Sequence, residues 1–153
     1  MSPSGRLHSG CLALALAASL STAASAQTEG GLYIAGAGFT FQEAAQRGIA
    51  QNPGGRRFFV LSLPPETGAL ASTATPAQQR LRERVLAANG VLLVCQRDLD
   101  NGRINAANLA PGVVPVRGNS NELPAGQRYF ANENPADLPA ANEALRRLRS
   151  TCS

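Results

Sequence analysis

The sequence contains no lysine, and its single histidine, His8, lies near the amino terminus. Without lysine, the phosphate-binding Gly-Lys-Ser/Thr signature cannot occur. Removal of an amino-terminal leader that contains His8 would leave no imidazole for a Ser-His-Asp triad, a Cys-His pair or a metal site. The composition therefore argues against hydrolytic and metal-dependent functions, and we expect neither a metal ion nor a bound cofactor.

The basic residues do not form a surface typical of nucleic-acid binding. All 14 are arginine, set against 10 acidic residues, which is a modest excess of positive charge. The longest clusters are the pairs Arg56-Arg57 and Arg146-Arg147, and no aromatic residues alternate with the arginines as they do in a nucleic-acid groove. We therefore expect no nucleic-acid partner.

The first 26 residues have the features of an export signal. Arg6 and His8 form a weak basic region, an apolar run follows from Cys11 to Leu20, and Ala24-Ser25-Ala26 supplies small residues for cleavage. The run is too short to span a bilayer, which takes about 20 residues as a helix. We expect residues 1–26 to be a signal peptide, with no stable membrane anchor and a periplasmic or secreted mature chain that starts at Gln27.

The mature chain, residues 27–153, has the length of one domain in which strands and helices alternate. Short apolar runs predict strands at 32–35, 58–63, 91–95 and 113–116, and more weakly at 128–131. Apolar spacing of three and four predicts helices from Phe41 to Ile49, over 76–88, over 104–109 and over 138–152. This alternation predicts an α/β fold, a parallel sheet of four to five strands with helices on both faces.

Local signals set the ends and faces of these elements. Thr40 with Glu43, and Thr75 with Gln78, form capping boxes at two helix starts. In the second helix the buried stripe is expected to be Ala77, Leu81, Val85 and Ala88, and the outward side Arg80, Arg82, Glu83 and Arg84. The segment 66–74 has no periodic pattern, which predicts a mobile loop beyond the end of the second strand.

Gly36-Ala37-Gly38 follows the first strand, where dinucleotide-binding proteins carry a glycine-rich turn. The third glycine of that fingerprint is missing, because position 41 is Phe, and the second strand ends without the acid that would bind a ribose. A simple turn between strand and helix is the favoured interpretation.

Cys95 ends the third strand, at the edge where open α/β sheets place their chemistry. Three states are open to it. It is a reactive thiol with Arg97 as stabiliser of the thiolate, a small buried side chain, or one half of a disulfide with Cys152, which lies on the apolar stripe of the last helix. Composition and spacing do not choose among them.

Three segments around the third and fourth predicted strands form a recognisable series: Asn89 to Cys95, then Gly102-Arg103-Ile104, then Asn108 to Val116. In these segments the chain resembles the DsrE/DsrF-like family of sulfur-relay proteins. The segments are similar to the family's helix, glycine and strand ending in Cys, its Gly-Ile pair and its Leu-x-Pro-Gly-Val segment. The resemblance covers about residues 31–118. Arg103 interrupts the Gly-Ile pair, and the segment after Gly118 departs from the family's usual ending.

The resemblance implies a DsrE-like sandwich that binds protein partners or assembles into trimers or hexamers. It also implies that Cys95 relays sulfane sulfur as a persulfide, which would make the protein at most a sulfur carrier or a transferase-like protein. The alternative is a non-catalytic periplasmic binding or assembly domain with a structural Cys95–Cys152 disulfide. Both remain hypotheses from the sequence.

Overall fold

The computed structural model describes residues 31–118 and 138–153. Four strands and four α-helices make up its regular elements, and short 3₁₀ turns connect some of them. In chain order the strands and helices are β1 (Leu32–Ala35), α1 (Phe41–Gln51), β2 (Phe58–Ser62), α2 (Pro76–Ala87), β3 (Gly90–Cys95), α3 (Gln96–Asp100), β4 (Val113–Val116) and α5 (Leu138–Thr151).

The four strands form one parallel sheet in the order β1-β2-β3-β4. This confirms the α/β class and the parallel sheet, whereas the predicted strand at 128–131 lies outside the described residues. Each strand is added on the same side of the one before it, so the strand order never reverses within the described chain. Ligand crevices of open α/β sheets form where that order reverses. The described strands therefore offer no such crevice.

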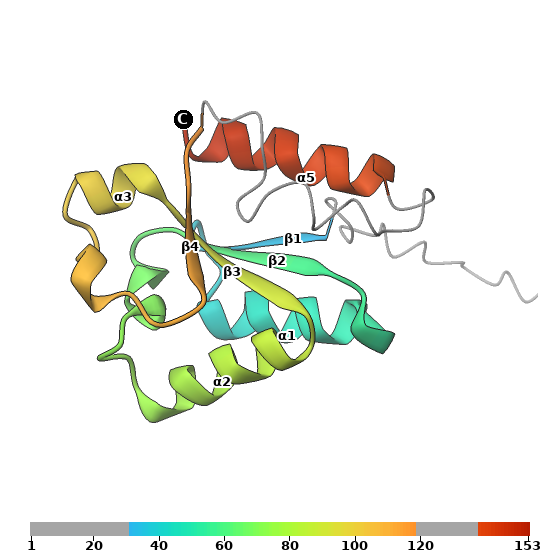
Figure 1. The fold of residues 1–153 in the computed structure, drawn as a ribbon, viewed down its shortest axis with the longest axis horizontal. Helices are drawn as coiled ribbons and strands as arrows, with labels where there is room; N and C mark the ends of the chain where they lie inside the picture. The colour runs from blue at the N-terminus through green and yellow to red at the C-terminus, as the bar shows by residue number, and fades with distance from the viewer. Residues whose placement is uncertain (1–30, 119–137) are drawn as a thin grey trace, which may run out of the picture.

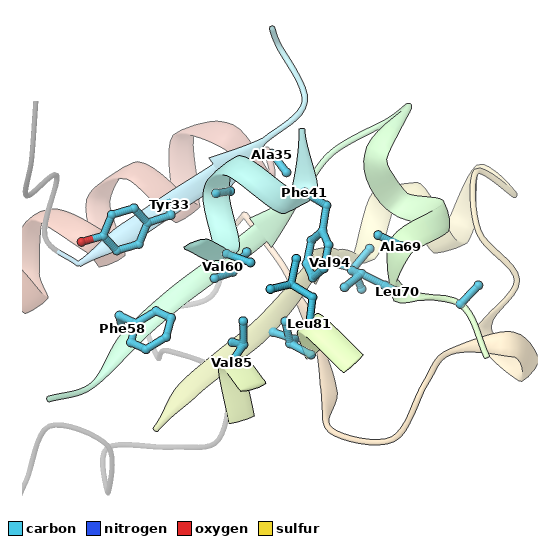
Figure 2. Close-up of a cluster of buried hydrophobic side chains, with 14 of the residues drawn as sticks. Tyr33, Ala35, Phe41, Phe58, Val60, Ala69, Leu70, Leu81, Val85 and Val94 are labelled. Atoms are coloured by element: carbon cyan, nitrogen blue, oxygen red, sulfur yellow. The ribbon is translucent and has the colours of Figure 1, made fainter. Parts of the chain in front are cut away.

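One face of the sheet packs against α1 and α2 (Figure 1). Alternate residues of the strands, which point to the same face, contribute Tyr33, Phe58 and Val94 to this cluster, and the helices contribute Phe41 and Leu81. Figure 2 shows these side chains converging between the sheet and the two helices. Both helices begin at the predicted capping boxes, in which the side chains of Thr40 and Thr75 accept hydrogen bonds from residues three positions on.

The opposite face of the sheet packs against α5, which Figure 1 shows across the strands from α1 and α2. Phe59, Leu61 and Leu93 face it from the strands, and Ala144 and Leu148 are its fully buried side chains. The apolar spacing of this helix predicts a buried stripe of Leu138, Ala141, Leu145, Leu148 and Cys152, and burial is confirmed at Leu148 and Cys152. Its first members, Leu138 and Ala141, have side chains outside the described part of the structure.

The ring of Phe58 explains two glycines in regular elements. A Cβ atom on Gly48 in α1 or on Gly90 at the start of β3 would lie 2.6 Å from ring atoms of Phe58. Glycine inside a helix costs about 1 kcal/mol relative to alanine. At Gly48 that cost is offset by the close approach of α1 to the sheet.

Two predictions about the second helix are wrong. Arg82 is buried rather than outward, with 8% of its surface exposed, and Ala77 is exposed rather than on the buried stripe. The guanidinium of Arg82 donates hydrogen bonds to the backbone oxygens of Ala69 and Ala71, so the helix uses this charged residue to bind a neighbouring segment. Desolvation by burial lowers the pKa of Arg82 from its usual value.

The segment predicted as a mobile loop is part of the core. Residues Glu66–Leu70 form a 3₁₀ turn in which Thr67, Ala69 and Leu70 are buried. Glu66 also accepts a hydrogen bond from the backbone of Phe41 at the start of α1, at 2.9 Å. The buried residues of this segment follow neither the two-residue period of a strand nor the 3.6-residue period of a helix. No sequence pattern therefore indicates that the segment is buried.

The link between β3 and β4 differs from its prediction as well. A five-residue helix, α3, begins directly after Cys95, where no helix was predicted. The helix expected over 104–109 is reduced to a 3₁₀ turn at Ala106–Asn108, which the side chain of Asn105 caps.

Candidate functional site

Cys95 and Cys152 form a disulfide that joins the end of β3 to the end of α5. Their Cα atoms are 5.2 Å apart, and 57 positions separate them in the sequence. Both residues are buried in the cluster between the sheet and α5, with Cys95 fully enclosed and Cys152 4% exposed. Of the three states that the sequence left open for Cys95, the structure contains the disulfide.

The disulfide changes what the strand-end cysteine can do. A sulfur in a disulfide is neither a thiolate nor a persulfide, so nucleophilic chemistry at Cys95 requires prior reduction of the bond. Reduction would leave the Cys95 sulfur fully buried in an apolar cluster, away from external reagents. The observed state is that of a structural disulfide.

Arg97, predicted to stabilise a thiolate, lies in α3 two residues beyond Cys95. Its side chain is exposed, and it donates a hydrogen bond to the backbone oxygen of Ser153. Arg97 therefore ties α3 to the residue after Cys152, and its hydrogen bond does not go to the sulfur of Cys95.

A shallow cavity of about 450 Å³ adjoins the disulfide. It is lined by Arg97 and Arg117, by Cys152 and Ser153, and by polar groups of α3. Cys95 does not line it among the described residues. An external reagent that enters this cavity would meet the chain at Cys152 before Cys95.

A second cavity, of about 250 Å³, lies beside β1. Leu32, Tyr33 and Ala44 form a buried floor, while Phe39 and Arg47 are exposed at the rim. Arg147 reaches the same cavity from α5. The cavity is therefore lined by residues of β1 and of two helices, α1 and α5, that lie on opposite sides of the sheet. The sequence analysis named none of these residues as functional.

The rim of this β1 cavity is a tight turn formed by Gly36 to Phe39. The backbones of Gly36 and Phe39 exchange two hydrogen bonds, at 2.7 and 3.1 Å. Ala37 and Gly38 between them both have positive φ, at 49° and 98°, which is the backbone of a type I′ turn. The predicted simple turn is confirmed, and it places the Phe39 ring 5.3 Å from the guanidinium carbon of Arg47.

Tyr33 anchors the floor of the β1 cavity through its hydroxyl. The hydroxyl donates to the side chain of Gln51 at 2.9 Å and accepts from Asn52 at 3.1 Å, and the ring packs edge-on against Phe58, as Figure 2 shows. Desolvation by burial raises the pKa of Tyr33 above its ordinary 10.0, against the opposing hydrogen bond from Asn52 and the charges of Arg56 and Arg47.

This raised pKa predicts a loss of stability in alkali. Because the folded pKa exceeds the unfolded one, the hydroxyl's contribution is complete below the unfolded pKa and is lost as pH rises through the folded pKa. Near neutral pH the Tyr33→Phe variant should be less stable by about 1 kcal/mol, the usual contribution of one hydrogen bond. Urea unfolding between about pH 9 and about pH 11 should show the two proteins converging. A constant difference across that range would contradict the prediction.

The described chain was also compared with the requirements of a metal site and of a membrane-spanning helix. Residues 31–118 and 138–153 contain no cluster of three or more His, Cys, Asp or Glu side chains that could hold a metal ion. No helix in those ranges is both long and apolar enough to cross a membrane. The carboxylate oxygen Oδ2 of Asp98 and the hydroxyl of Ser62 are buried without a hydrogen-bond partner in the described structure, but neither residue lines either cavity.

No protein-family model, curated protein or solved structure matches this chain. Inference about its function therefore rests on its own residues.

Proposed function

We propose that the mature chain, residues 27–153, is an exported binding or assembly domain without catalytic chemistry of its own. Its Cys95–Cys152 disulfide serves to hold α5 on the sheet. The observation that carries this proposal is the position of the disulfide, which joins a central strand to the end of the helix that packs against one face of the sheet. Disulfides persist in oxidising compartments, which agrees with the export signal expected in residues 1–26.

The disulfide joins α5 to a strand that is distant from it in the sequence. The 21 residues from 117 to 137 separate β4 from α5, so α5 packs against strands that are distant from it in the sequence. A link between distant residues stabilises a fold mainly by restricting the unfolded chain. The disulfide and the apolar contacts of Leu148 then act on the same helix and keep one face of the sheet covered.

The case for a binding domain also rests on the chemistry of the side chains. The only histidine belongs to the expected signal peptide, and the strand-end cysteine is committed to a disulfide. The β1 cavity is lined by arginine side chains and, among the described residues, by no acidic side chain, so it offers no carboxylate for acid-base chemistry.

The DsrE-like resemblance is compatible with this proposal. The order β-α-β-α-β over residues 32–95 and the cysteine at the end of β3 agree with the residues that carry the resemblance. We propose that the chain keeps a DsrE-like domain and protein partners or self-assembly while its cysteine has a structural role. The expected trimer or hexamer is part of this proposal.

Sulfur relay on Cys95 is the second candidate, and the cavity beside Cys152 is the observation that favours it. A dithiol would first reduce the disulfide by attack at Cys152 and become oxidised to a disulfide itself. The released Cys95 thiolate would then attack a terminal sulfur of a polysulfide, which leaves one sulfur atom shorter. Arg97 and Arg117 border the cavity through which such anions would approach.

Mass spectrometry of the intact mature protein distinguishes the two candidates. The protein is exposed to polysulfide and then to iodoacetamide, without reductant or denaturant. A structural disulfide predicts no added sulfur and no alkyl group on either cysteine. Protein first reduced in denaturant is the positive control, and both of its cysteines should be alkylated.

Two results would overturn the structural proposal. One is a sulfur atom on Cys95 in the untreated wild-type protein. The other is sulfur loading after mild reduction while α5 stays folded, as judged by hydrogen exchange. A Cys152→Ala variant completes the test, because it frees Cys95 without any reductant, and a failure to load sulfur there removes the relay candidate.

A further inference from the structure

Two arginines from opposite sides of the sheet line the β1 cavity. Arg47 belongs to α1 and Arg147 to α5, and Figure 1 shows these helices across the strands from each other. No acidic side chain lines the cavity among the described residues. Positive charges that share a cavity repel each other, and an anion bound between them would offset that repulsion.

The β1 cavity lies along the edge of the sheet rather than over one of its faces. β1 stands at one end of the strand order of the described sheet. Leu32 and Tyr33 are neighbours in this strand, and their side chains are buried in the clusters on opposite faces of the sheet. A cavity that both residues line therefore passes the strand at its outer edge. Such a cavity offers a ligand mainly the arginine side chains and the turn after β1, so its ligand should be polar.

The charge of Arg47 is open to an external anion. Glu43 precedes it by four positions, the spacing at which an acid commonly pairs with an arginine on a helix. The carboxylate of Glu43 instead accepts a hydrogen bond from the backbone of Thr40, at 2.8 Å, in the capping box of α1. The exposed side chain of Arg47 contacts the ring of Phe39, and no carboxylate among the described residues lies within ion-pair distance of it.

The ring of Phe39 and the turn before it fix the shape of this site. An arginine stacked on an aromatic ring keeps the N–H groups at the edge of its guanidinium available to oxygen acceptors. The turn is closed by two backbone hydrogen bonds between Gly36 and Phe39. A Cβ atom on Gly36 would lie 2.9 Å from the Cβ atom of Leu63, so the turn also packs closely on the residue after β2. A rim that is fixed before binding loses little conformational freedom when a ligand arrives.

We infer that the β1 cavity binds a dianionic phosphate group, free or as a small monoester, through the guanidinium groups of Arg47 and Arg147. Planar guanidinium groups bind phosphate oxygens in pairs, and two negative charges balance two arginines, whereas a carboxylate supplies one charge and one pair of oxygens. The volume of about 250 Å³ has room for a phosphate group with a short organic substituent. This inference rests on the proposed function, because it names a ligand class for the proposed binding domain.

Titrations followed by two-dimensional NMR of the oxidised mature protein, at constant ionic strength, test the inference. Glycerol 3-phosphate and inorganic phosphate are the probes, and glycerol is the uncharged match of the first. Both phosphates should shift the amide signals of Ala37, Phe39 and Arg47 saturably, with dissociation constants of about a millimolar, and glycerol should not. Tighter binding of glycerol 3-phosphate than of phosphate would assign the site to esters, and equal binding would assign it to the phosphate group alone.

The charge of the ligand provides a second readout. A phosphate monoester loses its second proton near about pH 6, so glycerol 3-phosphate is mainly a dianion at about pH 8 and mainly a monoanion at about pH 5. Guanidinium groups stay charged over that range, and burial raises the pKa of Tyr33, the other titratable residue of the lining, above its ordinary 10.0. Binding should therefore weaken about threefold or more at the lower pH. Sulfate carries two charges at both pH values and should bind equally at both.

Variants then assign the contact. Arg47→Gln and Arg147→Gln should each weaken binding of glycerol 3-phosphate about twofold to fivefold, the range for a solvent-accessible charged contact. The matched control is Arg84→Gln, which removes an exposed arginine from α2, outside the lining of the cavity, and it should leave the affinity unchanged. The melting temperature of each variant is measured as well, so that a change in affinity is not mistaken for a change in folding.

Three outcomes would overturn the inference. They are the absence of saturable shifts with both phosphates, equal weakening by the Arg47 and Arg84 substitutions, and an affinity for glycerol 3-phosphate that changes with pH no more than the affinity for sulfate does. The first would mean that the two arginines serve only to keep the edge of β1 from pairing with other strands, a role that charged residues have at sheet edges. Failure here with an intact disulfide leaves the structural proposal standing, and phosphate binding by a protein with two free thiols would do the reverse.

Discussion

The Cys152→Ser variant is expected to be less stable than the wild-type protein by about 4 kcal/mol. In the chain-entropy description, opening a loop of this length restores conformational freedom to the unfolded chain and lowers the free energy of unfolding by that amount. The substitution also puts a hydroxyl into the apolar cluster that contains Cys95 and Leu148, which adds to the loss. Urea unfolding of the disulfide-bonded wild-type protein and of the variant at neutral pH measures the difference.

Two controls separate the effect of losing the disulfide from the effect of replacing the Cys152 side chain. Wild-type protein unfolded in the presence of a reductant loses the bond but keeps both sulfur atoms, and it should show most of the effect. The Cys95→Ala/Cys152→Ala variant should resemble Cys152→Ser and should not respond to reductant. A difference below about 1 kcal/mol between oxidised and reduced wild type would mean that the bond does not stabilise the fold.

The Leu148→Ala variant is expected to lose about 3 kcal/mol. Leu148 is fully buried between α5 and the sheet, and truncating such a side chain removes its apolar contacts and leaves a cavity. Chemical denaturation measures the loss, and Leu86→Ala is the matched control. Leu86 is 41% exposed on α2, so its truncation should cost less than about 1 kcal/mol.

Equal losses at the two positions would contradict the packing of α5 on the sheet. The Leu148 loss should also interact with the disulfide, because both hold the same helix. We expect the double variant Cys152→Ser/Leu148→Ala to lose less than the sum of the single losses, since a helix already released has fewer contacts left to lose.

Much of the fold was predictable because its elements carry local signals. The apolar runs gave the bounds of β1 and β4 as the structure has them, and those of β2 and β3 to within one residue. Both capping boxes formed where Thr40 and Thr75 predicted them. These features depend on residues close together in the sequence, which is why a pattern can reveal them.

The errors have a physical cause in contacts between distant segments. Arginine is usually exposed, so the sequence predicts that Arg82 faces outward. Its burial depends on two carbonyl groups in a segment whose own structure was not predicted. The helix α3 is only five residues long, which is too short for a 3.6-residue period to be visible. The buried 3₁₀ turn over Glu66–Leu70 lacks both common periods.

The candidate sites were predictable to different degrees. With two cysteines left after the expected cleavage, only one intramolecular pair was available, so the sequence identified Cys95 and Cys152 but not their state. That state depends on a Cα separation of 5.2 Å, which no local pattern encodes. The β1 cavity was missed because Arg47 and Arg147 lie in helices distant in the sequence. The turn beside Phe39 was the one local sign of it.

The redox state of the two cysteines in the exported protein tests the central proposal most directly. The protein is expressed with its signal in a bacterium that exports proteins to an oxidising periplasm, recovered without reductant under acid quench, and weighed intact by mass spectrometry. The proposal predicts a chain that begins at Gln27 and is two hydrogen atoms lighter than its dithiol form, with no alkylation on native treatment. Recovery of the chain with both thiols free, or with extra sulfur on Cys95, would contradict it.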